Sequence, residues 1–234
     1  QAIKQAYSKQ FSYSKTTIAL ITIIINCQFF AIPTFNKLNS MKILSSDHKE
    51  LNTYLMAASE WIGKETILCF PDGEPKEYLY DLMRDYPQRG GKRFRPALVL
   101  LCCELFGGDP EDALNSAVAL ELFHNFALIH DDIEDESLLR RGKPTLHLLH
   151  GIALALNSGD ALLGLVHETL LKNHARLAST TAVRIHQHLN KVMRATFEGQ
   201  ALDIGWVAKR TFPDRTAYHE MIGRKTGWYS GKGP

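Results

Sequence analysis

Cysteine is scarce in this sequence, and its cysteines are poorly placed for a structural role. The 234 residues contain four of them, Cys27, Cys69, Cys102 and Cys103. Their spacing has neither the paired pattern of a zinc site nor the density of a disulfide-bonded secreted scaffold. We therefore expect all four thiols to be reduced, with Cys102 and Cys103 on a helix.

The sequence also lacks an excess of charge of one sign. Lysine and arginine number 27 against 25 aspartates and glutamates, which leaves a formal net charge of +2. This balance argues against nucleic acid as a partner. With 45% hydrophobic and 22% charged residues, the chain has the composition of a folded globular protein rather than a disordered one.

The N-terminal region has no apolar run of the length that a membrane span needs. Residues 17–32 are largely apolar but are interrupted by two amides, whereas a spanning helix needs about 20 apolar residues. The run suits the hydrophobic region of a signal peptide, although no small-residue cleavage site precedes Pro33. Since no methionine precedes Met41, residues 1–45 are either a targeting or membrane-associated extension or translated upstream sequence. We expect a cytoplasmic protein, with an organelle or membrane-associated location as the alternative.

Strand-type alternation is absent from residue 46 onward, where apolar residues recur every three or four positions. This periodicity predicts an all-α domain. One helix is expected to hold Pro96 in its first turn, to bury a stripe formed by Ala97, Leu98, Leu101, Cys102 and Leu105, and to end before Gly107. Another is expected to start at the Asp-Pro-Glu-Asp run of residues 109–112, which offers an N-cap, a first-turn proline and acids that favour the helix dipole. Further helices are predicted over about 159–172, 180–209 and from Asp214.

The helix that starts at residue 109 is predicted to end in an acidic run, D-D-x-x-D, formed by Asp131, Asp132 and Asp135. The first and third aspartates lie at i and i+4, on one helix face. Acids at a helix C-terminus oppose its dipole and repel one another without a cation. Carboxylates at this spacing suit Mg²⁺, which shares its coordination shell with substrate phosphates. The run therefore predicts a magnesium and diphosphate site, with a solvated acidic helix end as the alternative.

Two clusters of cations accompany this acidic run. G-G-K-R-F-R-P, residues 90–96, places Lys92, Arg93 and Arg95 on a glycine turn at a helix start, where cations are unfavourable unless an anion binds between them. R-R-G-K-P-T, residues 140–145, follows the acidic run, and its glycine and proline should turn the arginines back across the helix. Arginine binds phosphate bidentately. Both clusters predict diphosphate sites, and for residues 90–96 a solvated basic turn is the alternative.

Other polar residues occur at regular positions on the predicted helices. His124 lies on the face of the aspartates within an otherwise apolar helix, where a hydrogen-bonded core histidine is the alternative. On the helix predicted over 180–209, an apolar stripe ends in Gln200 and Asp203. This repeats the design of the first acidic helix, and a helix end that emerges into solvent is again the alternative.

Taken together, G-G-K-R-F-R-P, E-L-F-H-N-F-A-L-I-H-D-D-I-E-D and R-R-G-K-P-T resemble, in order and spacing, the motifs of the trans-isoprenyl diphosphate synthases of the geranylgeranyl diphosphate type. Residues 157–162, Gly199-Gln200 with Asp203, and Lys225-Thr226-Gly227 look like further landmarks, so the resemblance covers about residues 49–234. It implies antiparallel helices around a deep apolar cavity and a homodimer. It also implies the Mg²⁺-dependent, head-to-tail condensation of isopentenyl diphosphate with an allylic diphosphate.

The resemblance further implies roles for individual residues. Isopentenyl diphosphate is expected to bind Lys92, Arg95, His124 and Arg141. The magnesium on the allylic diphosphate is expected to bind Asp131, Asp132 and Asp135. Other contacts of that diphosphate are expected from Arg140, Gln200, Lys225 and Thr226. The three aspartates and Lys225 are then the catalytic residues, and the released diphosphate takes up the proton, which explains why no side-chain base stands out.

Product length is expected to depend on the residues just before the acidic run. Phe126 is the fifth residue before Asp131, and Ala127 is the fourth. One aromatic at the fifth position, with no insertion in the acidic motif, resembles the geranylgeranyl-producing pattern of archaeal-type enzymes. Two aromatics would suggest a farnesyl product. Phe126 is at the same time compatible with an ordinary core aromatic.

The sequence departs from the family pattern at its C-terminal end. The family has a second aspartate-rich motif beyond Lys225-Thr226, and the sequence ends at Pro234 before one occurs. We therefore expect residues 46–234 to form a partial synthase domain that is not fully active alone. One alternative is a non-catalytic, diphosphate-binding subunit of a heteromeric synthase. Another is a terpene cyclase or head-to-head condensing enzyme, against which the Lys92 and Arg95 motif argues.

Overall fold

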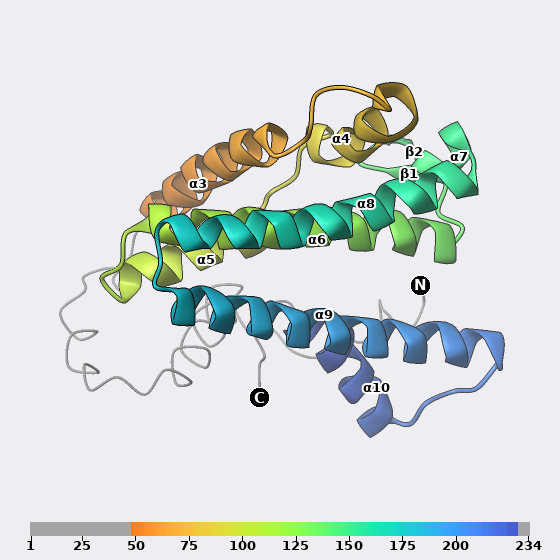
Figure 1. The fold of residues 1–234 in the computed structure, drawn as a ribbon. Coiled ribbons are helices and arrows are strands. Elements are labelled where there is room, and N and C mark those ends of the chain that lie inside the picture. The colour runs from red at the N-terminus through yellow and green to blue at the C-terminus, as the bar shows by residue number, and fades with distance from the viewer. Residues whose placement is uncertain (1–47, 229–234) are drawn as a thin grey trace. The chain divides into compact units, whose positions relative to one another are not determined.

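The computed structural model describes residues 48–228, so the predicted extension over residues 1–45 and Cys27 lie outside the described residues. The described chain is helical nearly throughout, as the periodicity predicted (Figure 1). Its elements are α3 (His48–Leu68), the π-helical turn η3 (Lys76–Tyr80), α4 (Asp81–Gln88), α5 (Phe94–Leu105), α6 (Pro110–Glu134), β1 (Leu139–Arg140), β2 (Lys143–Pro144), α7 (Leu146–His150), α8 (Ile152–Leu171), the 3₁₀ turn η4 (Lys172–Ala175), α9 (Ser179–Ala208), α10 (Arg215–Ile222) and η5 (Gly223–Gly227).

The chain divides into two compact units, and the first covers residues 45–190. Within it α6 is the central helix and packs against α5 on one side and α8 on another (Figure 1). Helix α3 packs against α5 and α6, and α4 against α3 and α8. The side chains of Leu122, Phe123 and Ile129 on α6 are 0–1% exposed. Burial of this helix holds its C-terminal end in a defined place.

The ends of α6 form as its sequence predicted. Asp109 is the N-cap, and its carboxylate accepts a hydrogen bond from the backbone N–H of Glu111 at 2.9 Å. Pro110 occupies the first helical position, where its missing N–H costs nothing. The helix ends at Glu134 with Asp135 as its C-cap. The acidic run therefore lies on the last turn of α6 and just beyond it.

Three local features differ from the sequence prediction. The short strands β1 and β2 pair antiparallel in the loop after α6, and strands of two residues carry no alternation that a pattern can reveal. Helix α8 begins at Ile152, before its predicted start. On α5 the buried residues are Pro96, Ala97 and Leu100, whereas Leu98 and Leu101 of the predicted stripe are only half-buried. The predicted stripe was therefore right at Ala97, and Leu100 is the buried residue that it missed.

The second unit contains residues 191–228 of the described chain, with the second half of α9, helix α10 and the turn η5. Helix α9 runs from Ser179 to Ala208, within one residue of its predicted bounds. Asp214 caps α10 by accepting a hydrogen bond from the backbone N–H of Ala217 at 2.8 Å. The helix expected from Asp214 is thereby confirmed.

Cys69, Cys102 and Cys103 are thiols that are not joined in disulfides, as predicted. Between residues 48 and 228, no helix combines the length and the apolar character needed to cross a bilayer.

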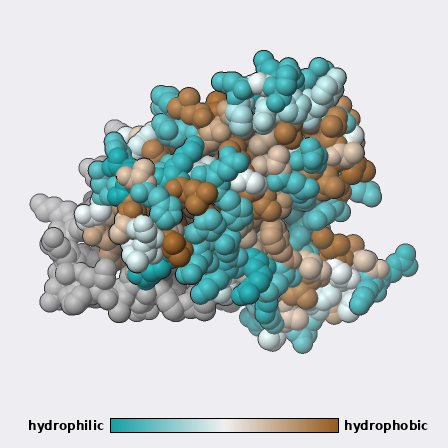
Figure 2. All heavy atoms as spheres, in the orientation of Figure 1, coloured by the Kyte–Doolittle hydropathy of each residue, from teal (hydrophilic) through white to brown (hydrophobic). Residues whose placement is uncertain are grey.

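Exposed apolar side chains gather around the β-strands, α7 and the start of α8, where Figure 2 shows hydrophobic surface. They are Leu138, Leu139, Leu148, Leu149, Ile152 and Leu156.

Candidate diphosphate site at the end of the central helix

The three aspartates of the acidic run have different environments. Asp131 is partly exposed, Asp132 is completely buried and Asp135 is exposed. Asp131 and Asp132 lie on the last turn of α6, whereas Asp135 follows its end. Adjacent positions on a helix point about 100° apart, which explains how one carboxylate enters the protein while its neighbour reaches the surface.

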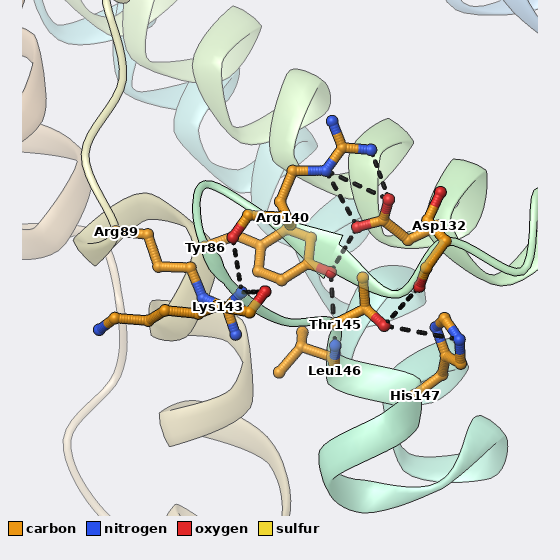
Figure 3. A network of polar contacts seen from close by, with 9 residues as sticks. Tyr86, Arg89, Asp132, Arg140, Lys143, Thr145, Leu146 and His147 are labelled. Carbon is orange, nitrogen blue, oxygen red and sulfur yellow. Dashed lines mark hydrogen bonds and ion pairs between the residues drawn. The ribbon is translucent and has the colours of Figure 1, made fainter.

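The buried carboxylate of Asp132 is surrounded by hydrogen-bond donors (Figure 3). The hydroxyl of Tyr86 donates to Oδ2 at 2.5 Å. Arg140 donates from Nε to Oδ2 at 3.1 Å and to Oδ1 at 3.2 Å, and its Nη2 also bonds Oδ1. This hydrogen bonding raises the pKa of Arg140. Both oxygens of Asp132 are therefore engaged within the protein.

The loop after α6 directs its two arginines to different groups. Arg140 reaches back to Asp132, as the glycine and proline of the loop predicted. Arg141, with φ 54°, instead donates from Nη1 to the backbone carbonyl of Tyr86 at 2.5 Å. Its guanidinium also lies against the glycine turn, because a Cβ on Gly91 would be only 3.0 Å from Nη2. Gly91 has φ 152° and needs the absence of a side chain for this approach.

The three cationic side chains of the glycine turn before α5 have different environments. Arg93 has φ 41° and caps α5, and its guanidinium points into the protein. It donates to the carbonyl of Pro87 at 3.0 Å and lies 3.9 Å from Glu121 Oε1. Lys92 is exposed, and Arg95 is half-buried. Of the three cations, Arg93 therefore serves the structure, whereas the roles of Lys92 and Arg95 in binding isopentenyl diphosphate stay predictions.

His124 lies on α6 among the arginines of the predicted isopentenyl diphosphate site. Burial, together with the nearby charges of Arg95, Arg141 and Arg140, lowers the pKa of this histidine to about 3. At neutral pH the ring is therefore uncharged. The structure thus brings Arg95, His124 and Arg141 together, with Arg140 on the side of the aspartates.

Glu121, one turn before His124, is 2% exposed. Burial raises the pKa of its carboxyl, whereas the hydrogen bond from Asn125 and the charge of Arg93 oppose that rise. The amide of Asn125 donates to Glu121 Oε1 at 3.2 Å. A buried acid thus lies beneath the cationic cluster.

The donor chemistry at the end of α6 fits magnesium that arrives with a diphosphate. Asp131 and Asp135 are carboxylates one helical turn apart, and both have solvent access. In the part of the chain from 48 to 228, no three His, Cys, Asp or Glu side chains converge as a ready-made metal cage. Mg²⁺ usually binds one or two carboxylates together with phosphate oxygens and water. Asp132 would have to release Tyr86 and Arg140 before it joined such a shell.

The residues expected to govern product length lie one to two turns before the aspartates. Phe126 is 5% exposed. Its ring centroid is 5.7 Å from that of Phe123 and 4.5 Å from that of His130. Ala127 is half-buried. Phe126 is therefore a core aromatic, and its influence on product length stays a prediction.

The remaining expected site residues belong to the second unit. Lys225 Nζ pairs with Asp203 Oδ2 at 2.8 Å. The backbone of η5 passes very close to α9, because a Cβ on Gly199 would lie 2.2 Å from Lys225 N. Gln200 is half-buried and Thr226 is exposed. Within this unit, α9 and η5 therefore bring Gln200, Asp203 and Lys225 to neighbouring positions.

Sequence patterns missed two residues of the network around Asp132. Tyr86 is 0% exposed and bonds Asp132 through its hydroxyl. Arg89 lies over the Tyr86 ring, 4.8 Å from its centroid, and donates to the carbonyls of Arg140 at 3.1 Å and Lys143 at 3.3 Å. Both precede the glycine turn by a few residues, but they form no motif. Nothing in the sequence distinguishes them from an ordinary core tyrosine and a surface arginine.

Comparison with known proteins gives consistent matches. A profile of the polyprenyl synthetase family matches residues 76–233. The chain is 40% identical over 151 residues to a geranylgeranyl pyrophosphate synthase of Geoglobus acetivorans, which covers 64% of this chain and 46% of that protein. It is 38% identical over 159 residues to the heterodimeric geranylgeranyl pyrophosphate synthase large subunit 2 of Arabidopsis thaliana, covering 66% of this chain and 42% of that protein. The chain spans about half the length of these curated relatives.

Solved structures of related proteins agree with these sequence matches. The geranylgeranyl pyrophosphate synthetase of Geoglobus acetivorans aligns with a TM-score of 0.70 and 35% identity, over 74% of this chain and 55% of that one. An FPP/GFPP synthase from Zymomonas mobilis aligns with a TM-score of 0.73 and 33% identity, over 77% and 66% of the two chains. With a family profile that covers more than half of its length and an all-α fold shared with solved members, the chain belongs to the polyprenyl synthetase family, as its resemblance to the trans-isoprenyl diphosphate synthases predicted.

Proposed function

We propose that this protein takes part in the Mg²⁺-dependent, head-to-tail condensation of isopentenyl diphosphate with an allylic diphosphate. The observation that carries the proposal is the division between two adjacent arginines. Arg140 turns to the aspartates at the end of α6, whereas Arg141 turns to the glycine turn that holds Lys92 and Arg95. Two diphosphate groups need two such sets of cations, and a single-diphosphate cyclase needs only one.

The two sets differ in a way that suits two different substrates. Lys92, Arg95 and Arg141 offer cations beside the neutral ring of His124, with the carboxyl of Glu121 buried near them. This arrangement is suited to the diphosphate of isopentenyl diphosphate, which leaves the reaction still attached to its carbon chain. Asp131 and Asp135, with Arg140, are suited to a magnesium-bound diphosphate that departs.

The reaction breaks the bond between the allylic carbon and its diphosphate oxygen and forms a carbon–carbon bond to isopentenyl diphosphate. When bound, magnesium supplies positive charge that stabilises the departing diphosphate. Arg140 adds a planar, bidentate donor to the same group. The double bond of isopentenyl diphosphate attacks the allylic cation, and the released diphosphate accepts the proton that is then lost. Apolar side chains along α6 exclude the water that would quench the cation.

We further propose farnesyl diphosphate as the allylic substrate and geranylgeranyl diphosphate as the product. The single aromatic at Phe126, with Ala127 beside it, supports this choice. The similar protein of Geoglobus acetivorans is named as a geranylgeranyl pyrophosphate synthase, which also supports it. Gln200, Lys225 and Thr226 are proposed as additional contacts of the allylic diphosphate.

For the assembly we propose a homodimer. The exposed leucines and isoleucine around the β-strands, α7 and the start of α8 support an interface, because large apolar patches on folded proteins mark interaction sites. A heteromeric complex is the other outcome to test, and one relative is named as the large subunit of a heterodimer. Light scattering on the purified chain distinguishes the two.

The deciding experiment incubates the purified chain with Mg²⁺, labelled isopentenyl diphosphate and farnesyl diphosphate. A version extended from its source transcript is assayed in parallel. We expect labelled geranylgeranyl diphosphate from the extended form, and none when the magnesium is chelated. Binding of isopentenyl diphosphate to the chain should survive chelation, since that set of residues is cationic.

Two other results would change the assignment. If both forms bind the diphosphates without condensing them, the protein is a diphosphate-binding subunit of a heteromeric synthase. If neither form binds isopentenyl diphosphate, the proposed second diphosphate site is wrong, and a cyclase becomes the better assignment.

A further inference from the structure

Tyr86 on α4 makes contacts on several sides, although it belongs to none of the motifs. Its side chain is 0% exposed. Its hydroxyl donates to Asp132 Oδ2 at 2.5 Å and accepts from the backbone N–H of Leu146 at 3.4 Å. Its backbone carbonyl accepts from Arg141 Nη1 at 2.5 Å. One residue therefore contacts an aspartate of the acidic run and one of the two arginines that follow it.

The hydroxyl contact bears on the orientation of Arg140. A carboxylate can rotate about its last bond, and Arg140 bonds both oxygens of Asp132 through a planar fork. The hydrogen bond from Tyr86 to one of these oxygens defines the plane of the carboxylate (Figure 3). The plane of the carboxylate in turn sets the plane of the guanidinium.

The position of Tyr86 is itself determined by neighbouring contacts. Arg89 covers its ring and donates to the carbonyls of Arg140 and Lys143, which ties α4 to the two strands. The backbone N–H of Leu146, at the start of α7, donates to its hydroxyl. The tyrosine is therefore held rigidly enough to orient Asp132.

We propose that Tyr86 is a positioning residue for the allylic diphosphate site, with its hydroxyl acting through Asp132 on Arg140. This inference rests on the proposed function, since it assigns Arg140 to the allylic diphosphate. If Tyr86 has a positioning role, loss of its hydroxyl should affect Arg140 and not Arg141. The hydroxyl serves Arg140, whereas Arg141 is held by the backbone carbonyl, which a phenylalanine also has.

Tyr86→Phe in the full chain tests the proposal. Tyr54→Phe is the control, because it removes another tyrosine hydroxyl beside a carboxylate, that of Glu104, from the half-buried Tyr54 on α3. Calorimetry measures the binding of two probes separately. The first is an unreactive allylic thiodiphosphate with Mg²⁺, and the second is isopentenyl diphosphate with a chelator. Urea unfolding of each variant reports the loss of stability.

In Tyr86→Phe we expect the dissociation constant of the allylic thiodiphosphate to rise about tenfold, as for the loss of a hydrogen bond to a charged group. The affinity for isopentenyl diphosphate should stay as in the wild type. Tyr54→Phe should change neither affinity.

Failure of the positioning role and failure of the proposed function give different results. If Tyr86→Phe weakens both probes equally, or weakens the allylic probe no more than Tyr54→Phe does, Tyr86 is merely structural and the proposed function still stands. If the wild-type protein binds neither probe, the proposed function is wrong and the positioning role falls with it.

Discussion

Arg140 donates to both carboxylate oxygens of Asp132, which lies on the last turn of α6. The acidic helix end predicts a positive partner, because the helix dipole and the neighbouring acids both disfavour a lone carboxylate. The structure shows that the chain supplies one such partner itself. Asp132 is thereby engaged, while Asp131 and Asp135 keep the solvent access that a magnesium ion requires.

Removing Arg140 should destabilise the protein. Arg140→Met leaves the buried carboxylate of Asp132 with only part of its hydrogen bonds, which should cost about 3 kcal/mol in the free energy of unfolding. Urea unfolding at neutral pH measures the loss. The double variant Asp132→Asn/Arg140→Met should recover part of it, because the uncompensated charge is gone. A double variant as unstable as the sum of the single ones would contradict this account.

The exposed aspartate should govern the need for magnesium. Asp135→Asn removes a carboxylate that is proposed to hold the ion, so the Mg²⁺ concentration for half-maximal binding of an allylic thiodiphosphate should rise about tenfold or more. Thermal stability should not fall, because an acid beyond a helix C-terminus opposes the dipole. Glu136→Gln, an exposed acid one residue further on, serves as the control and should leave the magnesium requirement unchanged.

His124 should make the protein sensitive to acid. Its pKa in the folded chain is about 3, whereas the ring in the unfolded chain takes up a proton near pH 6.5. Between these values the unfolded state binds more protons, so stability falls as the pH drops from about 6.5 toward about 3. We expect His124→Asn to lose less stability than the wild type between neutral pH and about pH 4.5. His150→Asn, at an exposed histidine, should behave as the wild type does in the same urea titrations.

Phe126 is expected to limit the length of the product. Phe126→Ala should lengthen it, measured by chromatography of the prenyl alcohols released from the products. Loss of a buried aromatic costs about 3–5 kcal/mol, so Phe126→Leu provides a milder change in the same direction. Phe123→Leu alters a neighbouring buried ring and controls for packing. Unchanged products from both Phe126 variants would reject the idea.

The close approach at Gly199 should be essential to the second unit. A Cβ there would lie 2.2 Å from Lys225 N, so Gly199→Ala should displace η5 and separate Lys225 from Asp203. Hydrogen exchange over residues 223–227 should then accelerate, and the affinity for the allylic probe should fall. Gly205 lies on the same helix with no atom near its Cβ position. Gly205→Ala should therefore stabilise the helix by about 0.5–1 kcal/mol and leave exchange in η5 unaltered.

Much of the fold was predictable because helix signals are local. Asp109 and Pro110 start α6 through contacts with residues three or fewer positions away, and apolar spacing shows where the helices run. The stripe predicted for α5 was right at Ala97 but missed Leu100, because Leu98 and Leu101 are as apolar as the buried Leu100. Which face is buried depends on the packing of α3 and α6 against α5.

The site also has features that the sequence predicts and features that only the fold reveals. By itself, the sequence determined which residue types occur near the end of α6, because the aspartates and the arginines that follow them lie within one short stretch. Only the tertiary structure decided that Asp132 is buried, that Arg93 points inward, and that Tyr86 reaches Asp132 from 46 residues away. Such contacts depend on how distant helices pack, and no periodicity in the chain records which side chains that packing brings together.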